Sequence, residues 1–322
     1  MSTHAVVFRG TGFLGHHVVA AVRAAGLVPV VATRRPDAVT DGTTVAPMAH
    51  NGCDQVAAVL ARWQPDVVVN AAGEIWQPSA TALWSANVDF PANVVAAMTA
   101  TRSRARMVHL GSSLEYGCVE PPHRLREDSL VVPSSHYGRT KAEGTRRVLR
   151  AGVDAVVLRV FNAIGPGVSP DSVLGRAATN LARAQRDHAR ATIELLDQDQ
   201  YRDYIDAADV AEAVVAAALA TLPRSHRLIN IGTGEARTTA SVVRLLADLS
   251  GADYHVARSR SVDPGRTAGA AWQRADPSRA HDLLGWSART PLVQTLAALW
   301  AATAEPHPLH TRPYVRKAEK DD

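Results

Sequence analysis

A tyrosine and a lysine four residues apart are the strongest catalytic candidates in this chain. They belong to Tyr137-Gly138-Arg139-Thr140-Lys141, at the start of a segment with helical periodicity, so both side chains are expected on one helix face. An ammonium group beside a phenol favours the ionised phenol, and a tyrosine with a lowered pKa can act as a general acid-base near neutral pH. Lys141 is also the only lysine in the first 316 residues of a chain with 35 Lys and Arg residues. This usage indicates a role that a guanidinium cannot fill.

A glycine-rich segment near the start of the chain indicates a dinucleotide site. The apolar run 5–8 leads into Gly10-Thr11-Gly12-Phe13-Leu14-Gly15, after which helical periodicity begins. Glycines allow a tight turn and a close approach of the backbone to a pyrophosphate, and the amides of a helix N-terminus bind the anion. In this context the motif predicts dinucleotide binding rather than an ordinary glycine turn. The candidate cofactor contacts are Gly10, Gly12, Phe13, Leu14 and Gly15.

The end of the second expected strand bears on which dinucleotide binds. The sequence there is Thr33-Arg34-Arg35, whereas an acidic residue would hold the ribose 2′-hydroxyl of NAD and repel a 2′-phosphate. Two guanidinium groups can bind a phosphate through several donors. The segment therefore predicts NADP(H), contacted by Thr33, Arg34 and Arg35. NAD stays open as a cofactor, as does the alternative that both arginines are solvated turn residues.

Apolar runs and helical periodicity alternate over the first half of the chain. The expected strands are 5–8, 28–32, 66–70, 106–111 and 155–161, and the expected helices are 12–25, 56–63, 87–101 and 137–150. Near-continuous Val-rich strands separated by helices are typical of a parallel sheet buried on both faces. We therefore predict an α/β fold: a Rossmann, doubly wound parallel sheet with a smaller α/β substrate domain.

A turn-dense segment after residue 161 suggests the boundary between two domains. Residues 1–161 are predicted to form the NADP-binding Rossmann domain, 162–306 mainly the substrate-binding domain, and 307–322 a polar tail. Segments within 192–219 are expected to complete the large sheet. Segments within 228–251 and 277–286 are expected in the smaller domain.

Composition and charge exclude several classes of protein. The chain is 46% apolar and 20% charged, its net charge of +4 is scattered without a basic run, and no nucleic-acid motif is present. No apolar stretch approaches the about 20 residues that span a bilayer, and no secretory leader is recognisable. Cys53 and Cys118 alone make neither a disulfide framework nor a thiolate metal site. We expect a cytoplasmic protein without a metal, a nucleic-acid partner or a membrane partner.

A further group of motifs lies where strands are expected to end. The strand 106–110 runs into Gly111-Ser112-Ser113, at the edge where open α/β sheets bind ligands, and a serine hydroxyl there can hydrogen-bond a reacting carbonyl oxygen. The motifs that accompany it are Asn70-Ala71-Ala72-Gly73, Asn87-Val88, Arg159-Val160-Phe161-Asn162, Gly165-Pro166-Gly167, Arg202-Asp203-Tyr204-Ile205, Asn230-Ile231-Gly232-Thr233-Gly234 and Ala275-Asp276-Pro277. With these motifs, residues 5–300 resemble the extended short-chain dehydrogenase/reductases that act on nucleotide sugars.

The resemblance implies a catalytic set and a substrate. The implied catalytic residues are Ser112, Tyr137 and Lys141. The implied cofactor contacts also include Ala71, Ala72, Gly73, Asn87, Tyr137 and Lys141. A nucleotide-diphosphate sugar is the implied substrate, with Ser112, Ser113, Asn162 and Arg202 as its contacts. The resemblance further implies a homodimer formed through helices 87–101 and 137–150.

Two positions depart from the pattern of the family that the chain resembles. Arg9 stands where the glycine pattern usually begins, and its side chain would either crowd the turn or reach a phosphate. Asp263 stands where an arginine often faces the diphosphate, which leaves Arg260 and Arg266 as alternative candidates.

Because the family includes dehydratases, epimerases and reductases, the reaction depends on individual residues. Leu114 stands where dehydratases carry an acid-base pair, which argues against dehydration. Leu114 and Ser172 also replace the cysteine and histidine of dual epimerase-reductases, while Cys118 is expected to be a buried apolar residue. The leading prediction is NADPH-dependent reduction of the C4 carbonyl of a nucleotide-linked 4-keto-6-deoxysugar. An NAD-retaining 4-epimerase and a non-catalytic NADP-sensing protein are the alternatives.

Overall fold

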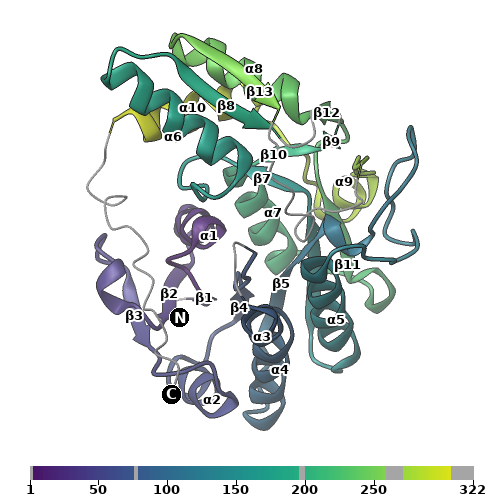
Figure 1. Ribbon diagram of the computed structural model, residues 1–322. Helices are drawn as coiled ribbons and strands as arrows, with labels where there is room; N and C mark the ends of the chain where they lie inside the picture. Colours follow the sequence, from purple (N-terminus) through teal and green to yellow (C-terminus); the bar gives the residue numbers. More distant parts are fainter. Residues whose placement is uncertain (1–2, 76–78, 196–199, 259–270, 306–322) are drawn as a thin grey trace, which may run out of the picture.

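The chain folds into two parts, a large parallel sheet layered between helices and a smaller α/β part above it (Figure 1). The computed structural model describes residues 3–75, 79–195, 200–258 and 271–305.

The large sheet has seven parallel strands in the order β11-β6-β5-β4-β1-β2-β3. Their bounds are β1 (His4–Phe8), β2 (Val28–Thr33), β3 (Thr44–Pro47), β4 (Val67–Asn70), β5 (Arg106–Ser112), β6 (Ala155–Val160) and β11 (Leu228–Ile231). The strand order reverses between β1 and β4. Open α/β sheets bind ligands in the crevice at the carboxyl ends of such a pair, so the site is expected there.

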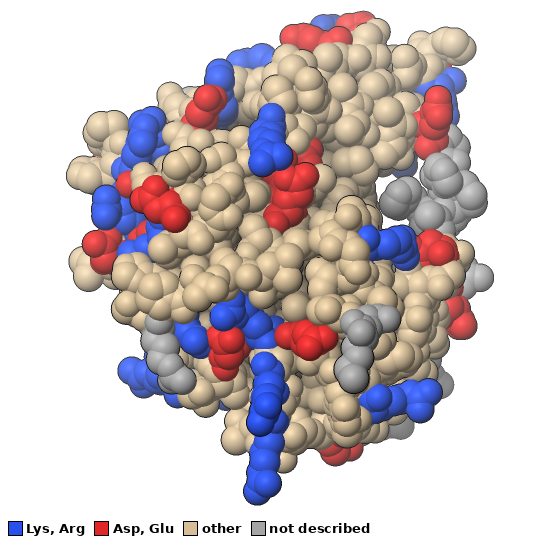
Figure 2. Space-filling view, turned by 180° about the vertical axis from the view of Figure 1, so that it is seen from behind, with Lys and Arg blue, Asp and Glu red and all other residues tan. Residues whose placement is uncertain are grey.

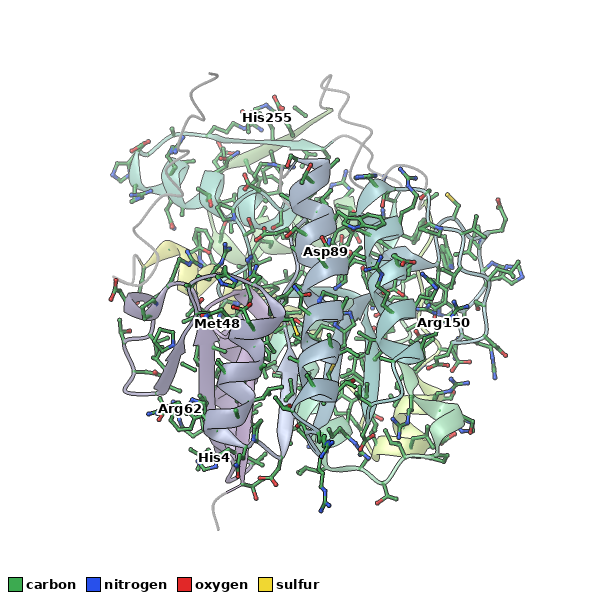
Figure 3. The ribbon with its side chains drawn as sticks, turned by 90° about the horizontal axis from the view of Figure 1, so that it is seen from below. His4, Met48, Arg62, Asp89, Arg150 and His255 are labelled. Atoms are coloured by element: carbon green, nitrogen blue, oxygen red, sulfur yellow. The ribbon has the colours of Figure 1, made fainter. Side chains whose placement is uncertain are left out.

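The sheet is buried on both faces because successive strand residues alternate between two cores. In β1, Ala5 and Val7 belong to one core, and Val6 and Phe8 belong to the other. The first core is covered by α1 (Phe13–Ala24) and α7 (Ala207–Leu219), and the second by α2 (Cys53–Trp63), α4 (Phe90–Ala100) and α5 (His136–Arg150). Figure 3 looks onto the second helix layer, where α2, α4 and α5 lie side by side.

The smaller part has its own core of apolar side chains, which includes Leu181, Leu246 and Leu296. Its elements are α6 (Val173–Arg186), α8 (Thr239–Ser250), α10 (Leu292–Ala304) and the parallel pair β8 (Ala191–Leu195) and β13 (Tyr254–Arg258). Two short strand pairs lie where the parts meet: β7 (Asn162–Ile164) with β10 (Tyr204–Asp206), and β9 (Tyr201–Arg202) with β12 (Arg237–Thr238). The remaining short elements include α3 (Ala80–Trp84), a π-helical turn (Ser85–Asp89), the 3₁₀ turn η3 (Ser113–Glu115) and α9 (Ser278–Leu284).

The predicted Rossmann fold is confirmed, and the expected strands and helices of the first 161 residues are all present. The expectation that 192–219 completes the large sheet is wrong. There, β8 pairs with β13 in the smaller part, and α7 covers a face of the large sheet. The seventh strand is β11, expected above in the smaller domain, which pairs with β6. A parallel neighbour of β6 needs a helical crossover, and α7 supplies it.

On the face drawn in Figure 2, basic and acidic side chains are interspersed rather than gathered by sign. Among the residues that the structure describes, no helix is long and apolar enough to cross a membrane. The same residues contain no group of three or more His, Cys, Asp or Glu side chains placed to hold a metal ion. The predicted tail, 307–322, lies outside the described residues.

Candidate active site

The glycine-rich segment forms the turn between β1 and α1. Gly12 donates its backbone N–H to the Arg9 carbonyl over 2.9 Å. A Cβ atom on Gly15 would collide with that carbonyl oxygen, so this close approach of helix and turn requires glycine. Among the described residues, no side chain caps α1, and its first turn contains no acidic residue. No anionic side chain of the described part of the chain therefore occupies the first amides of α1, which fits a pyrophosphate at the carboxyl end of β1.

The end of β2 lies beside this turn. The Thr11 and Thr33 hydroxyl oxygens are 3.4 Å apart, and Thr33 Oγ1 accepts the Arg35 N–H over 3.0 Å. Arg34 and Arg35 are exposed. The structure thus brings the predicted 2′-phosphate contacts next to the glycine turn, with both guanidinium groups open to solvent.

Three candidate catalytic residues meet at the carboxyl end of β5. Ser112 is the last residue of β5, and Tyr137 and Lys141 lie in the first turns of α5. The Ser112 side chain lies close to the Tyr137 phenol and acts to lower the pKa of Tyr137. Lys141 is buried, and its Nζ donates to the Leu110 carbonyl. The predicted set is therefore assembled by one strand end and one helix start.

Burial dominates the protonation of Tyr137 and Lys141. It raises the pKa of Tyr137 to about 12, although the Ser112 side chain acts in the opposite direction. It lowers the pKa of Lys141 to about 8, although the Glu115 carboxylate acts in the opposite direction. The expectation that the Tyr137 pKa is lowered is wrong for this structure, because loss of solvation outweighs the favourable contacts. Tyr137 is a protonated phenol at neutral pH.

A buried ion pair supports the Ser112 backbone. Glu115 Oε1 accepts the Ser112 N–H and the Thr145 hydroxyl, each over 2.9 Å, and Oε2 accepts Arg159 Nε over 2.8 Å. The Arg159 guanidinium lies 4.4 Å from the centre of the Tyr116 ring. The sequence analysis missed this pair. The capping-box spacing of Ser112 and Glu115 was a signal that could have indicated it.

Asn87, in the π-helical turn, links the loop after β4 to α5. Asn87 Oδ1 accepts the Glu74 N–H over 3.2 Å, and its Nδ2 donates to Thr140 Oγ1 over 3.1 Å. A Cβ atom on Gly73 would lie 3.8 Å from Lys141 Nζ. The structure thus brings the predicted cofactor contacts of this loop beside the lysine, and a small residue at position 73 leaves space at the crevice.

Gln273 joins two of the predicted substrate residues. Its Oε1 accepts from Ser113 Oγ and from Asn162 Nδ2, each over 3.3 Å. It is fully buried, and its Nε2 has no hydrogen-bond partner among the described residues. Arg202 is also buried and donates to Gln200 Oε1 over 2.8 Å. No motif spacing marks Gln273, so sequence reasoning missed it, and Arg260, Asp263 and Arg266 lie outside the described residues.

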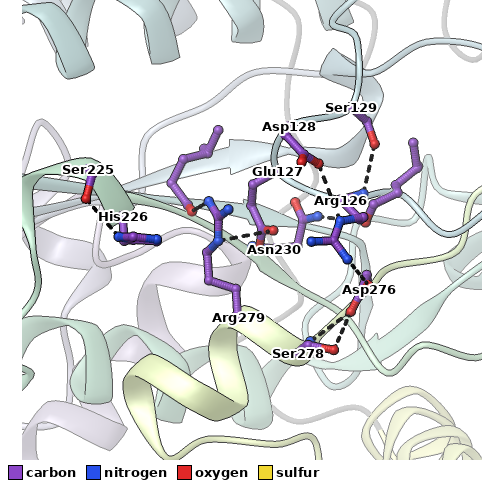
Figure 4. A network of polar contacts seen from close by, with 12 residues as sticks. Arg126, Glu127, Asp128, Ser129, Ser225, His226, Asn230, Asp276, Ser278 and Arg279 are labelled. Carbon is purple, nitrogen blue, oxygen red and sulfur yellow. Dashed lines mark hydrogen bonds and ion pairs between the residues drawn. The ribbon is translucent and has the colours of Figure 1, made fainter.

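A polar network links the loop after η3 to the start of α9 (Figure 4). Arg126 Nη1 lies 3.4 Å from a carboxylate oxygen of Asp276, and Arg279 Nε lies 3.4 Å from a carboxylate oxygen of Glu127. The two ion pairs connect the loop after η3 to Asp276, which precedes α9, and to Arg279 in α9.

Comparison with known proteins agrees with this geometry. The model of the NAD dependent epimerase/dehydratase family matches residues 5–232, more than half of the chain. The chain belongs to this family. The resemblance inferred from the motifs is therefore confirmed.

Similar members of the epimerase/dehydratase family include dehydrogenases and reductases. The dTDP-6-deoxy-L-talose 4-dehydrogenase (NAD(P)(+)) of Kitasatospora kifunensis is 34% identical over 303 residues, which cover 92% of this chain and 94% of the relative. The GDP-6-deoxy-D-mannose reductase of Pseudomonas aeruginosa is 26% identical over 246 residues, 73% of this chain and 79% of the relative. Other relatives are UDP-glucose and UDP-arabinose 4-epimerases. The structure of RMD from Pseudomonas aeruginosa with NADPH has the same fold, with a TM-score of 0.78 and 22% identity over 94% of this chain and 99% of that one.

Within the epimerase/dehydratase family, three residues of this chain bear on the reaction. Leu114 is buried behind Ser112 and has no group that exchanges protons. Ser172 caps α6 by accepting the Gly175 N–H over 2.9 Å, which is a structural role. The expectation that Cys118 is buried is wrong, because the chain leaves the core after η3 and exposes it.

Proposed function

We propose that this protein is an NADPH-dependent ketoreductase that reduces the C4 carbonyl of a nucleotide-linked 4-keto-6-deoxysugar. The observation that carries the proposal is that Ser112, at the end of β5, and the phenol of Tyr137, in the first turn of α5, lie close enough for the serine side chain to act on the pKa of the tyrosine. A protonated phenol is the form that a ketone reduction requires, because the carbonyl oxygen must receive a proton.

Each residue of the proposed site has a separate role in the reaction. A bound nicotinamide cofactor supplies the hydride. Ser112 donates a hydrogen bond to the carbonyl oxygen, and Tyr137 donates its phenolic proton to that oxygen, so that the ketone becomes a secondary alcohol. We assign to the buried Lys141 ammonium the role of stabilising the phenolate that remains. Glu115 holds the Ser112 N–H and keeps the hydroxyl at the strand end.

The same residues serve either direction of the reaction. In the direction of oxidation, Tyr137 must first release its proton to solvent, and the phenolate that forms then takes the proton of a C4 hydroxyl. The 34% identical relative is named for a 4-dehydrogenase and the 26% identical one for a reductase, and both names describe oxidation or reduction of nucleotide-linked 6-deoxysugars. The buried Leu114 and the capping Ser172 add support, because neither provides the second acid or base that dehydration or carbanion chemistry needs.

The choice of NADPH rests on the two exposed arginines. Arg34 and Arg35 follow Thr33, which lies beside the glycine turn at Thr11. Two guanidinium groups at this strand end favour a 2′-phosphate over a bare 2′-hydroxyl. NAD is kept as the cofactor of the second candidate, a 4-epimerase, which the 4-epimerases among the relatives favour.

The assignment of domains and assembly is part of this proposal. We assign cofactor binding to residues 1–161 together with β11, and nucleotide-sugar binding mainly to 162–306 around Asn162, Arg202 and Gln273. A homodimer through α4 and α5 is proposed on the family pattern.

Turnover with a panel of substrates tests the proposal. The purified protein is mixed with NADPH and with dTDP-, GDP- or UDP-linked 4-ketosugars, and the loss of NADPH absorbance is followed. We expect one class of ketosugar to consume an equal amount of NADPH, and Tyr137→Phe to suppress this loss. Interconversion of two 4-hydroxy sugars without net NADPH consumption would support the 4-epimerase instead. Binding of NADPH without turnover of any nucleotide sugar would support a sensor.

A further inference from the structure

An ion pair crosses the crevice between β1 and β4. Arg9 directly follows β1. Its Nη1 donates to Glu74 Oε1 over 2.7 Å, and its Nη2 donates to the same oxygen. Glu74 lies in the loop after β4. The carboxyl ends of these two strands flank the point where the strand order reverses, which is where a dinucleotide crosses an open α/β sheet. A cation and an anion thus lie beside the first amides of α1, which no side chain of the described residues caps.

The backbone conformation at Arg9 indicates that the arginine side chain has a role other than forming the turn. Arg9 has a φ of 60°, a left-handed conformation that glycine adopts without strain and arginine does not. A non-glycine residue in this conformation is strained, because its Cβ atom lies too close to the neighbouring carbonyl oxygen. The conformation persists because the Arg9 carbonyl accepts the Gly12 N–H and packs against Gly15. Arginine at this position therefore offers nothing to the turn itself, only its side chain.

Glu74 is fixed by contacts that do not involve its carboxylate. Asn87 accepts the Glu74 N–H and donates to the Glu74 carbonyl, each over 3.2 Å. The Glu74 backbone is thereby held at the crevice, which keeps the carboxylate within reach of this region whether or not Arg9 pairs with it. An unpaired carboxylate there would repel a pyrophosphate, which carries two negative charges.

Solvent reaches this pair. The Arg9 and Glu74 side chains are 33% and 38% exposed. An ion pair with this exposure contributes little to stability and exchanges partners readily. An incoming dianion at the first turn of α1 can therefore compete with Glu74 for the guanidinium.

We infer that Arg9 is a pyrophosphate-binding residue of the dinucleotide site and that Glu74 is the counterion with which the cofactor competes. The inference rests on dinucleotide binding, which the proposed function also requires. Since both NADPH and NADH carry the pyrophosphate, the pair sets the affinity for both cofactors equally. The 2′-phosphate contacts proposed for Arg34 and Arg35 are separate from it.

The test compares Arg9→Gly, Glu74→Gln and the double variant. The dissociation constants of NADPH and NADH are measured by fluorescence titration without any sugar substrate. We expect Arg9→Gly to weaken both cofactors by about tenfold, because it removes a charge-assisted contact and leaves Glu74 unneutralised. We expect Glu74→Gln to tighten both severalfold, because the guanidinium no longer has a competing anion. The double variant should lie between Arg9→Gly and the wild type.

The matched control is Arg102→Gly. Arg102 also has a positive φ, of 50°, and is exposed, but it precedes β5 and so lies at the amino edge of the sheet, away from the crevice. This variant should bind both cofactors like the wild type. Thermal unfolding without cofactor monitors the fold of each variant, and Glu74→Gln keeps the test decisive if Arg9→Gly unfolds.

The outcomes separate this inference from the proposed function. Weaker binding by Glu74→Gln would overturn the inference, because the pair would then only position the loops. An effect of Arg9→Gly on NADPH alone would overturn it as well. If the predicted changes in binding occur but no 4-ketosugar is reduced, the proposed function fails and the inference stands. If ketosugar reduction is found and the binding constants are unchanged, the inference fails alone.

Discussion

Replacing Lys141 with Met is expected to stabilise the protein while removing its activity. Lys141 is 3% exposed, and burial lowers its pKa from 10.5 to about 8. Since one pKa unit corresponds to about 1.4 kcal/mol, keeping the ammonium charged in the folded protein costs about 3 kcal/mol at pH 7. Methionine has a similar length and no charge, but it leaves the Leu110 carbonyl without this donor, which costs about 1 kcal/mol. The expected net gain in the free energy of unfolding is about 2 kcal/mol.

The sign of the pH dependence follows from the direction of the pKa shift. The pKa of Lys141 in the folded protein is below that in the unfolded chain, so the cost of the charge is complete below pH 8. It disappears as the pH rises from about 8 to 10.5, because the folded protein releases the proton first. At pH 9.5 about 1.4 kcal/mol of the cost remains. The advantage of the Met variant should therefore shrink to nearly zero.

The assay is urea unfolding of wild type and variant, followed by tryptophan fluorescence at pH 7 and pH 9.5. Arg150→Met serves as the control, because Arg150 is the exposed last residue of the same helix. Its difference from the wild type should be small at both pH values. The reasoning would be refuted if Lys141→Met were less stable than the wild type at pH 7, or if its stability difference did not change with pH.

Three further substitutions test the site. Tyr137→Phe should keep NADPH binding but lower the turnover rate by about 10²- to 10⁴-fold, since only the proton donor is removed; steady-state rates near the wild type would exclude Tyr137 as the acid. The double change Arg34→Ala and Arg35→Ala should raise the dissociation constant of NADPH at least about tenfold and leave that of NADH unchanged. Equal weakening of both cofactors would argue against 2′-phosphate binding. Glu115→Ala should lower the free energy of unfolding in urea by about 3 to 5 kcal/mol, because it leaves the Arg159 charge buried without its carboxylate; a loss below about 1 kcal/mol would contradict this account.

The Rossmann core could be predicted from the sequence because its signal is local. Val-rich runs such as β4 and β5 are buried on both faces. Glycines and helical periodicity in the segments between such runs indicate turns and helices. The positions of Ser112 and Tyr137 followed from the same pattern, since the carboxyl ends of parallel strands meet at one edge.

The later half of the chain was predicted less well, because its apolar runs are short and alike. The runs that became β8 and β11 have similar composition, and only pairing decides which one joins β6. Gln273 could not be predicted as a site residue for a related reason. Gln273 accepts a hydrogen bond from Ser113, which lies 160 residues away in the sequence. No short-range spacing in the sequence predicts that contact.

The sequence by itself determined the order of strands and helices, the glycine turn and the side chains available for chemistry, because these depend on neighbours along the chain. Only the tertiary structure decided their charge states and pairings. The pKa of Tyr137 rises because packing removes water from the phenol, and Arg9 meets Glu74 because β1 and β4 are neighbours in the sheet. Both effects depend on groups brought together through space, and their free energy arises only when the chain has folded.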